Sequence, residues 1–287
     1  MNAEEFLSEA LASPICPPDF KETYEYFKKY QEMSLKCLLE FHRICKKNGI
    51  NYHVTYGSLL GLIRDGGQIP WDYDIDVFVP IYEKDKLLEA LKNDLSDEFY
   101  AMCPEFDSSC RHYILRLCPK NYDSAAIHLD VFYFCGCPTD EQTRKQFSDK
   151  IKTCSKVRYS KKVEVKKEAT GNWKRFIKYS VAKAGSVLFS MKKIDRQYNE
   201  LVFKYPVDEC EFVTSADIFA GDYTFKTEML TKTIDYSVNG ITLSIPENYK
   251  EFLVELYGDY MSYPSLERRI KQVLHASGRF KYFEKFN

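Results

Sequence analysis

The sequence has 287 residues, of which 45% are hydrophobic and 29% charged, and its net charge is −1. That length suits one large domain or two small ones, and the near-neutral charge gives no general attraction to nucleic acid. No run approaches 18 apolar residues, and residues 1–10 lack the basic and apolar regions of a signal peptide. We therefore expect a cytoplasmic protein without a nucleic-acid partner, whose ten cysteines are reduced thiols rather than zinc ligands.

Two elements are predicted ahead of the first motif. Residues 19–47 carry apolar side chains at helical spacing, which predicts a long helix that Asp19 caps and Asn48-Gly49 ends. Residues 50–56 are rich in β-branched and aromatic side chains, which predicts a strand. We expect the helix to pack beside this strand.

A Gly-Ser turn follows, and then the apolar face of a short helix over residues 59–63. A strand, a turn and a helix N-terminus together present backbone N–H groups and a hydroxyl to an anion. Gly57 lets the backbone approach a phosphate closely. An ordinary N-cap role for Ser58 is the alternative, and the two are compatible because one hydroxyl can serve either purpose.

Three aspartates at alternate positions, Asp72, Asp74 and Asp76, precede the apolar residues 77–79. Residues two apart on a strand share a face, so we expect Asp74 and Asp76 side by side, with Asp72 at the entrance. Such carboxylates repel each other unless one is protonated or a cation lies between them. Hard oxygen ligands select Mg²⁺ or Mn²⁺. A solvated acidic strand end is the alternative, which the apolar flanks and the Gly-Ser turn disfavour.

A third carboxylate follows on an apolar strand. Residues 82–95 predict an amphipathic helix, and the segments 99–103, 113–118 and 126–134 predict short strands. In the last of these, only His128 and Asp130 interrupt the apolar run, and a buried charge is costly unless it is paired or metal-bound. A salt-bridged strand aspartate is the alternative for Asp130. For His128 we expect a packed or surface position rather than a substrate contact.

Helices are predicted next. Residues 139–157 are polar and helix-like, and the basic residues 157–167 are expected to be a solvated face or a loop. Residues 171–205 form a basic amphipathic stretch with a weak break at Ala184-Gly185. We expect this stretch to pack on the core, with contact to an anionic membrane surface as the alternative.

The C-terminal part predicts a strand, a hairpin and a helix. Residues 212–214 are strand-like, and Asn239-Gly240 joins two strand patterns over residues 232–238 and 241–245 as a hairpin turn. Pro246 then opens a helix that ends at residue 257.

These motifs resemble a known family. A strand, a Gly-Ser turn, a helix and a strand bearing Asp-x-Asp is similar to the nucleotidyltransferase superfamily. Within it, residues 56–80 and 245–264 resemble the LicD family of phosphotransferases, which includes the fukutin-related proteins. Asp65, Gly66, Gln68 and Tyr73 depart from the family pattern. The matching residues are Gly57, Leu60, Gly61, Arg64, Gly67, Ile69, Pro70, Trp71, Asp72, Asp74, Ile75 and Asp76.

The resemblance implies a mixed α/β (α+β) fold, with a nucleotidyltransferase-like core sheet over about residues 49–134 and flanking helices. A helical insertion over about residues 139–205 and a C-terminal hairpin and helix over about residues 206–287 complete one catalytic domain, residues 1–287.

The implied function is metal-dependent transfer of phosphocholine, ribitol phosphate or a similar group from a CDP-linked donor. The acceptor is a hydroxyl of a glycan or lipid-linked glycan in lipopolysaccharide, teichoic acid or capsule synthesis, which places the enzyme in the cytoplasm with peripheral contact at the inner membrane face left open. Asp74, Asp76 and Asp130 would bind one or two Mg²⁺ or Mn²⁺ ions, and Asp72 would act as a further ligand or as the catalytic base.

Further site residues follow from the same motif. Gly57 and Ser58 would hold a phosphate, and Arg64 would reach a donor phosphate unless it forms a structural ion pair with an aspartate. Tyr56 and Trp71 are expected to stack on the base or cargo, or to pack in the core.

Two other functions stay open. One is a nucleotidyltransferase that attaches NMP and releases pyrophosphate, and the other is an inactive binding or scaffold relative, which the three carboxylates argue against. The shortage of cations near Gly57 favours a diphosphate donor with CMP as leaving group, unless Arg111, Arg116 or Lys120 fold into the site.

Overall fold

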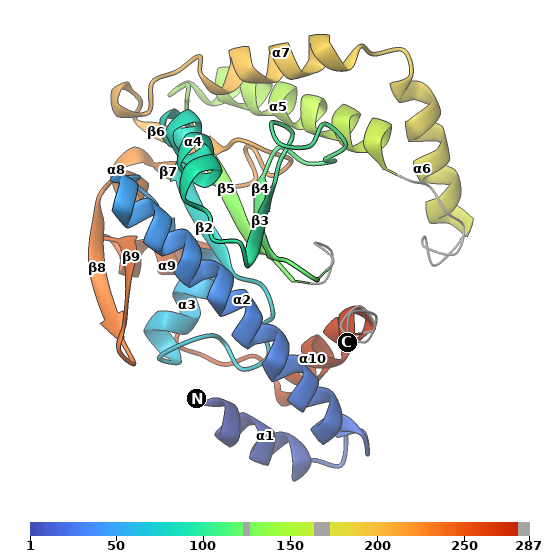
Figure 1. Cartoon of the computed structure of the whole chain (residues 1–287), viewed down its shortest axis with the longest axis vertical. Coiled ribbons are helices and arrows are strands. Elements are labelled where there is room, and N and C mark those ends of the chain that lie inside the picture. Colours follow the sequence, from blue (N-terminus) through green and yellow to red (C-terminus); the bar gives the residue numbers. More distant parts are fainter. Residues whose placement is uncertain (123–126, 164–172, 281–287) are drawn as a thin grey trace.

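A mixed β-sheet lies at the centre of the molecule, and the computed structural model describes residues 1–122, 127–163 and 173–280 (Figure 1). The strands lie in the order β1-β2-β5-β4-β3, while β6 pairs with the second half of β5 and β7 pairs with β6. Helices flank the sheet, which confirms the predicted mixed α/β class. The strands are β1 (His53–Val54), β2 (Asp76–Pro80), β3 (Phe99–Met102), β4 (Leu115–Pro119), β5 (Leu129–Cys137), β6 (Phe212–Ser215) and β7 (Thr224–Lys226).

The two central strands bring predicted carboxylates together. β2 and β5 run parallel, and their register sets Asp76 opposite Asp130. The residues that follow, such as Val77 and Val131, are fully buried. Apolar side chains hold both strands in the core. Because the strands are parallel and in this register, the two aspartates lie at the same end of the sheet, where the strands begin.

Three strand predictions were wrong in their extent. Residues 50–56 form only the short strand β1, because Tyr56 already begins helix α3 (Tyr56–Arg64) with a positive φ of 48°. β2 begins at Asp76, so Asp74 lies in the segment before the strand. β5 runs three residues further than predicted, to Cys137, since its second half has β6 as a partner; residue 126 lies outside the described residues.

Helix α2 (Phe20–Asn48) crosses one face of the sheet (Figure 1). Phe27, Phe41 and Ile44 on this helix are fully buried. Gly49 ends the helix with φ 60°, a left-handed conformation that glycine adopts without steric cost, as predicted. Asp19 stands at the N-cap position but makes no side-chain capping hydrogen bond, so the predicted cap is wrong.

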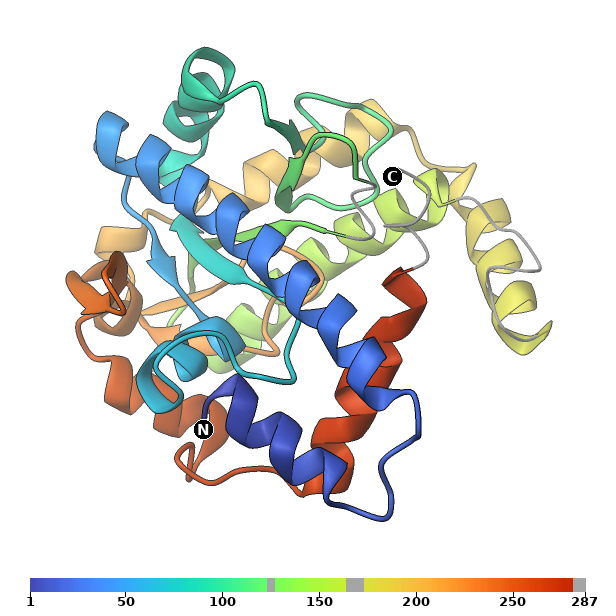
Figure 2. The ribbon, with the colours of Figure 1, turned by 60° about the horizontal axis from the view of Figure 1, so that its bottom comes forward.

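Three helices were not predicted: α1 (Ala3–Leu11), α8 (Thr227–Thr231) and α10 (Leu266–Phe280). The first has a readable signal, because the Asn2 side chain accepts from the Glu5 N–H and the Glu5 carboxylate accepts from the Asn2 N–H. Figure 2 shows α1, α10 and the start of α2 gathered at one end of the molecule.

The predicted helical insertion contains α5 (Glu141–Lys162), α6 (Trp173–Ser186) and α7 (Met191–Val202). α5 continues to Lys162, so residues 157–162 are helical and not a loop, and all of them except the buried Arg158 are partly exposed. Residues 164–167 lie outside the described residues. Arg158 on α5 is almost fully buried and donates to Asp195 on α7 (2.8 Å) and to the Cys110 carbonyl (2.9 Å). The insertion is thereby fastened to the segment that leads into β4.

A hairpin and short helices complete the chain. β8 (Thr233–Val238) and β9 (Ile241–Pro246) pair around Asn239 and Gly240, which both have positive φ, so the predicted hairpin is confirmed. The helix predicted over residues 82–95 appears as α4 (Lys84–Asp94), which follows the 3-10 turn Ile81–Glu83. The helix predicted to end at residue 257 appears as α9 (Tyr249–Tyr257). Across the ranges that the structure describes, we find no helix of the length and apolarity that a membrane span requires.

Candidate functional site

A cavity of about 490 Å³ opens at the end of the sheet where β2 and β5 begin. Its lining includes Asp72, Asp74, Asp76 and Asp130, so the structure brings the four predicted carboxylates together. A larger cavity of about 920 Å³ lies elsewhere, beside the 3-10 turn that follows β2, and none of the predicted site residues lines it. We therefore take the smaller cavity as the candidate site.

The carboxylates make this end of the sheet strongly acidic. Burial raises the pKa of Asp76 well above its usual range, and the neighbouring charges of Asp74, Asp130 and Asp72 raise it further, while Arg116 opposes them. Asp130 behaves in the opposite way. Although burial disfavours its charge, His128 and Arg116 lower the pKa of Asp130 to about 2.

Arg116 is the direct partner of Asp130. Its Nε donates to Asp130 Oδ1 (2.8 Å), and His128 Nε2 lies 3.5 Å from the other oxygen. Asp130 is thus both a cavity residue and a salt-bridged strand aspartate, and His128 is buried behind it, as the expected packed position requires. Arg116 also lines the cavity, so a distant cation does fold into the site.

The donor set suits a hard divalent cation. Oxygen atoms of Asp74, Asp76 and Asp130 border one cavity, and Asp76 carries a charge that its buried surroundings disfavour. Within the described ranges, however, no group of three or more His, Cys, Asp or Glu side chains is arranged so that it could hold a metal ion. Asp130 is paired with Arg116 in this structure, and a metal-binding role for Asp74, Asp76 and Asp130 stays a prediction.

Gly57 has a clear steric role at the cavity wall. A Cβ atom at this position would lie 2.7 Å from Asp72 Oδ2, closer than real side chains approach. Burial raises the pKa of Asp72, while the backbone N–H groups of Asp74 and Tyr73 donate to its carboxylate and oppose the rise. The role of Asp72 as ligand or base stays a prediction, as does phosphate contact at Gly57.

Ser58 does not reach the cavity. Its Oγ accepts a hydrogen bond from the Asp76 N–H (2.9 Å), and the side chain borders a separate small cavity beside the hairpin. The Ser58 hydroxyl thus ties α3 to the first residue of β2, and its phosphate contact stays a prediction.

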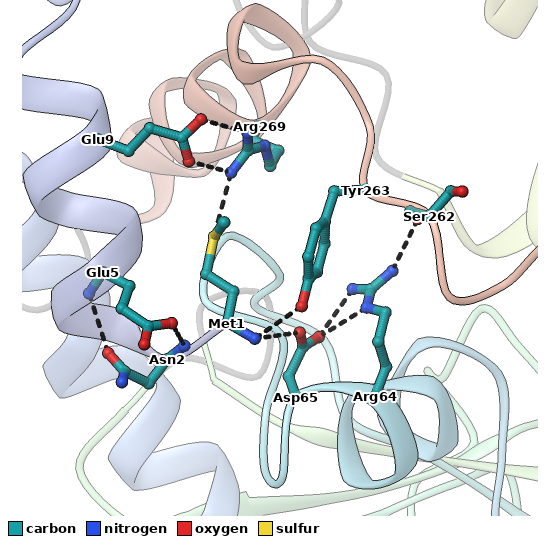
Figure 3. A network of polar contacts seen from close by, with 9 residues as sticks. All are labelled: Met1, Asn2, Glu5, Glu9, Arg64, Asp65, Ser262, Tyr263 and Arg269. Carbon is teal, nitrogen blue, oxygen red and sulfur yellow. Dashed lines mark hydrogen bonds and ion pairs between the residues drawn. The ribbon is translucent and has the colours of Figure 1, made fainter.

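Arg64 and Trp71 also do not line the cavity, and Figure 3 shows Arg64 paired with Asp65. Arg64 pairs with Asp65 (2.8 Å), and the two side chains are only 3% and 1% exposed. The guanidinium packs against the rings of Trp71 and Tyr263, at 5.6 and 4.7 Å from their centroids. The alternative of a structural ion pair is thus correct for Arg64, and core packing is correct for Trp71, which is 2% exposed.

The same network joins three parts of the chain. The Met1 amino group donates to Asp65 (3.3 Å) and to the Tyr263 hydroxyl (2.7 Å), while Arg269 pairs with Glu9 (2.8 Å), as Figure 3 shows. Asp65, which departs from the family pattern, therefore has a structural role that its local sequence did not reveal.

Replacing Arg64 by Gln is expected to lower stability and leave donor binding unchanged. Breaking a buried ion pair costs about 3–5 kcal/mol because the remaining charge is left buried, and each 1 kcal/mol corresponds to about 2–4 °C in Tm for a chain of this size. Thermal unfolding and CDP-choline titration measure the two quantities. The double variant with Asp65→Asn is expected to regain part of the stability. A large loss of donor affinity in folded Arg64→Gln protein would contradict this assignment.

Several cavity residues were missed in the sequence. Asp217 lies two residues after β6 and is only 4% exposed. Its Oδ1 accepts a hydrogen bond from the Phe219 N–H (2.7 Å). Its Oδ2 is buried without a hydrogen-bond partner in the described part of the chain. Burial raises the pKa of Asp217 to about 6. A carboxylate directly after a predicted strand was the available signal.

Aromatic rings form another part of the lining. Phe219, Tyr223 and Tyr257 are partly exposed in the cavity, and Tyr56 lies between them and the core, 5.5 Å from the Tyr223 ring. His112 also lines it, and burial together with Arg116 and Arg111 lowers the pKa of His112 to about 4. No local pattern indicated His112, Phe219, Tyr223 and Tyr257, since they come from three separate segments. Stacking by Tyr56 stays a prediction.

The mixed sheet has carboxylates at the start of adjacent parallel strands, and they face a cavity beside a Gly-containing helix start. This is the arrangement that the nucleotidyltransferase resemblance implies. Residues 49–144 match the LicD/FKTN/FKRP nucleotidyltransferase domain. The chain therefore carries a LicD-family domain, and the resemblance predicted from the sequence is confirmed. The chain is also 26% identical, over 264 aligned residues, to the lipopolysaccharide cholinephosphotransferase LicD of Haemophilus influenzae. The match covers 84% of this chain and 93% of the relative.

Proposed function

We propose that this protein is a phosphotransferase that moves phosphocholine from a CDP-linked donor to a hydroxyl of a lipopolysaccharide-type glycan at the cytoplasmic side of the membrane. The observation that carries the proposal is the register of β2 and β5, in which Asp76 lies opposite Asp130 beside the cavity. The named activity of the Haemophilus relative, matched over most of both chains, supports the cargo and the acceptor class.

Asp74, Asp76 and Asp130 would hold Mg²⁺ or Mn²⁺, which supplies a positive charge for the donor diphosphate and the departing CMP. The protein groups have separate tasks. Arg116 is held against Asp130 and contributes a guanidinium to the cavity, where it is suited to a donor phosphate. Gly57 keeps the wall free of a side chain where Asp72 approaches.

Charge supports a diphosphate donor over a triphosphate. Among the described residues that line the cavity, Arg116 is the only Arg or Lys, since Arg64 is paired with Asp65 outside it. Three phosphates would be poorly neutralised by one guanidinium, whereas a diphosphate that also meets the carboxylate-bound cation is well matched. Arg116, and not the Arg64 expected from the sequence, is therefore the cation suited to the donor phosphates. A single guanidinium favours a diphosphate donor and release of CMP.

The aromatic side of the cavity supports a cationic cargo. Tyr223, Tyr257 and Phe219 line the cavity together with Asp217, and their side chains are partly exposed. A quaternary ammonium is attracted to both ring faces and carboxylates without needing a hydrogen bond. Ribitol, by contrast, is neutral and needs hydrogen-bond partners for its hydroxyls. These contacts favour choline over ribitol.

The donor identity decides the proposal. Incubation with CDP-choline, Mg²⁺ and a glycan acceptor is expected to release CMP only when the acceptor is present, and mass spectrometry is expected to find phosphocholine on the glycan. Pyrophosphate release from CTP, with nucleotide left on the acceptor, would instead support the nucleotidyltransferase alternative. Tight donor binding without any transfer would support a binding or scaffold role.

The cargo contact is tested separately. Tyr223→Leu is expected to raise KM for CDP-choline about tenfold, since a desolvated cation–π contact is worth up to about 2 kcal/mol, and to change KM for CDP-ribitol little. If CDP-ribitol is the better donor for the unmodified enzyme, the cargo assignment fails while the transferase assignment stands.

A further inference from the structure

Helix α6 has two apolar sides, and the described residues of the chain cover only one of them. The side formed by Phe176, Tyr179 and Lys183 is partly buried toward α5: the Tyr179 ring lies 6.2 Å from that of Tyr159, and Lys183 donates to the Val163 carbonyl. Trp173 and Val181 are respectively 63% and 66% exposed, and Ile177 between them is exposed as well. Their spacing of four residues places these three side chains in one stripe along the helix.

The stripe continues into the turn between α6 and α7. Val187, Leu188 and Phe189 are all exposed, and Leu188 reaches 88%. The turn is held in place, because Lys161 at the end of α5 donates to the carbonyl groups of Ser186 and Phe189. We call these six residues, Trp173, Ile177, Val181, Val187, Leu188 and Phe189, the α6 outer face. Figures 1 and 2 show α6 at the edge of the molecule, apart from the sheet.

Positive charge is concentrated around this face. Between residues 173 and 193 the sequence has six basic residues, Lys174, Arg175, Lys178, Lys183, Lys192 and Lys193, and no acidic residue. Lys174 and Lys178 are exposed beside the apolar stripe, and Lys192 and Lys193 are exposed after the turn. The whole chain has a net charge of −1, so this basic surface is a local feature and not a general property.

We propose that the α6 outer face docks on an anionic phospholipid membrane surface. Exposed apolar side chains of this kind mark an interaction site, and the surrounding lysines are complementary to anionic headgroups. The helix has 14 residues, which is too short to span a bilayer but suited to lying in its interface. The expectation that this stretch packs on the core is thus half correct, since α5 covers only its inner side. If the proposed function holds, docking brings the cavity to a membrane-anchored glycan.

The test uses the full chain and vesicles that contain neither donor nor glycan acceptor, so its result does not depend on catalysis. At low salt the protein is expected to co-sediment with vesicles of phosphatidylglycerol and phosphatidylcholine, and to bind vesicles of phosphatidylcholine alone much more weakly. High salt is expected to weaken binding, because the Debye length falls from about 30 Å at 0.01 M to about 3 Å at 1 M.

Two double variants separate the charge from the apolar stripe. A lysine near an anionic surface contributes about 1 kcal/mol, or roughly fivefold in binding, so Lys174→Glu with Lys178→Glu is expected to lower low-salt partitioning by about 30-fold or more. Ile177→Ser with Val181→Ser is expected to lower it at least tenfold at any salt concentration. Lys250→Glu and Val254→Ser on α9 are matched controls, because both side chains are exposed far along the chain from α6.

Several outcomes overturn the proposal. These are the absence of binding to anionic vesicles at low salt, unchanged binding in both double variants, and equal losses in the α9 controls. If the unmodified protein instead self-associates in gel filtration and the apolar variant is monomeric, the α6 outer face is a protein interface. Equal Tm values for all four variants exclude misfolding as the cause of any loss, since every altered side chain is exposed.

Discussion

Asp76→Asn is expected to abolish transfer and, at the same time, to make the metal-free protein more stable. The carboxylate is buried next to Asp74 and Asp130, and its raised pKa reflects the resulting free-energy cost. Asparagine has the same shape without the charge, so the Tm without metal is expected to rise by a few degrees at pH 7. Activity is expected to fall about a thousandfold or more, because the proposed cation would supply several kcal/mol and 1.36 kcal/mol is a factor of ten.

Metal titration distinguishes this role from simple packing. Addition of Mg²⁺ or Mn²⁺ is expected to raise the Tm of the unmodified protein, since a ligand that binds only the folded state stabilises it, and to raise that of the Asp76→Asn variant much less. Chelator is expected to stop turnover. Asp130→Asn is expected to lose most activity as well. Asp97→Asn, at a fully exposed surface carboxylate, is the matched control. Full activity of the Asp76→Asn variant would contradict the metal assignment.

Arg116→Gln is expected to lower kcat/KM by about 100–1000-fold, the range found when one preorganised donor to a developing charge is removed. Arg116 lines the cavity, pairs with Asp130, and is the described lining's only Arg or Lys. Arg116→Lys is expected to regain part of the activity, because it keeps the charge but loses the planar fork. Steady-state kinetics with varied donor concentration measure both variants.

Arg111 is the natural control, since it is exposed in the same segment and does not line the cavity. Arg111→Gln is expected to keep kcat/KM within about threefold of the unmodified enzyme. Equal losses in the two Gln variants would mean that general positive charge, and not a specific contact, explains the effect. Wild-type kinetics for Arg116→Gln would mean that a group other than Arg116 binds the donor phosphate.

Local sequence patterns were sufficient for the parts of the fold that depend on neighbouring residues. The helical spacing of apolar residues in α2, the glycine that ends it, and the Asn-Gly turn of the β8–β9 hairpin all appear as predicted. The alternating aspartates and the carboxylate within the apolar strand likewise led to one cavity. In each case a periodicity or a required φ value is written into a few consecutive residues.

Tertiary structure decided which partner each polar group meets. Arg64 was expected at a phosphate, but Asp65, Trp71 and Tyr263 enclose it, and Ser58 is used by the Asp76 amide. Two similar arginines in one sequence carry no local sign of which will be buried in a structural pair and which will face a cavity. That choice depends on how the C-terminal segment folds back over α3.

The opposite wall of the cavity was likewise beyond local patterns. Asp217, Tyr223 and Tyr257 reach the carboxylates of β2 and β5 only because β6 pairs with β5 and the C-terminal segments return to the sheet. The sequence by itself therefore determined most of the strands, the hairpin turn and the three-carboxylate motif, which depend on the spacing of near neighbours. The position of Arg116 in the cavity, the aromatic part of its lining and the exposed side of α6 depend on contacts between segments far apart in the chain, and only the tertiary structure decided those.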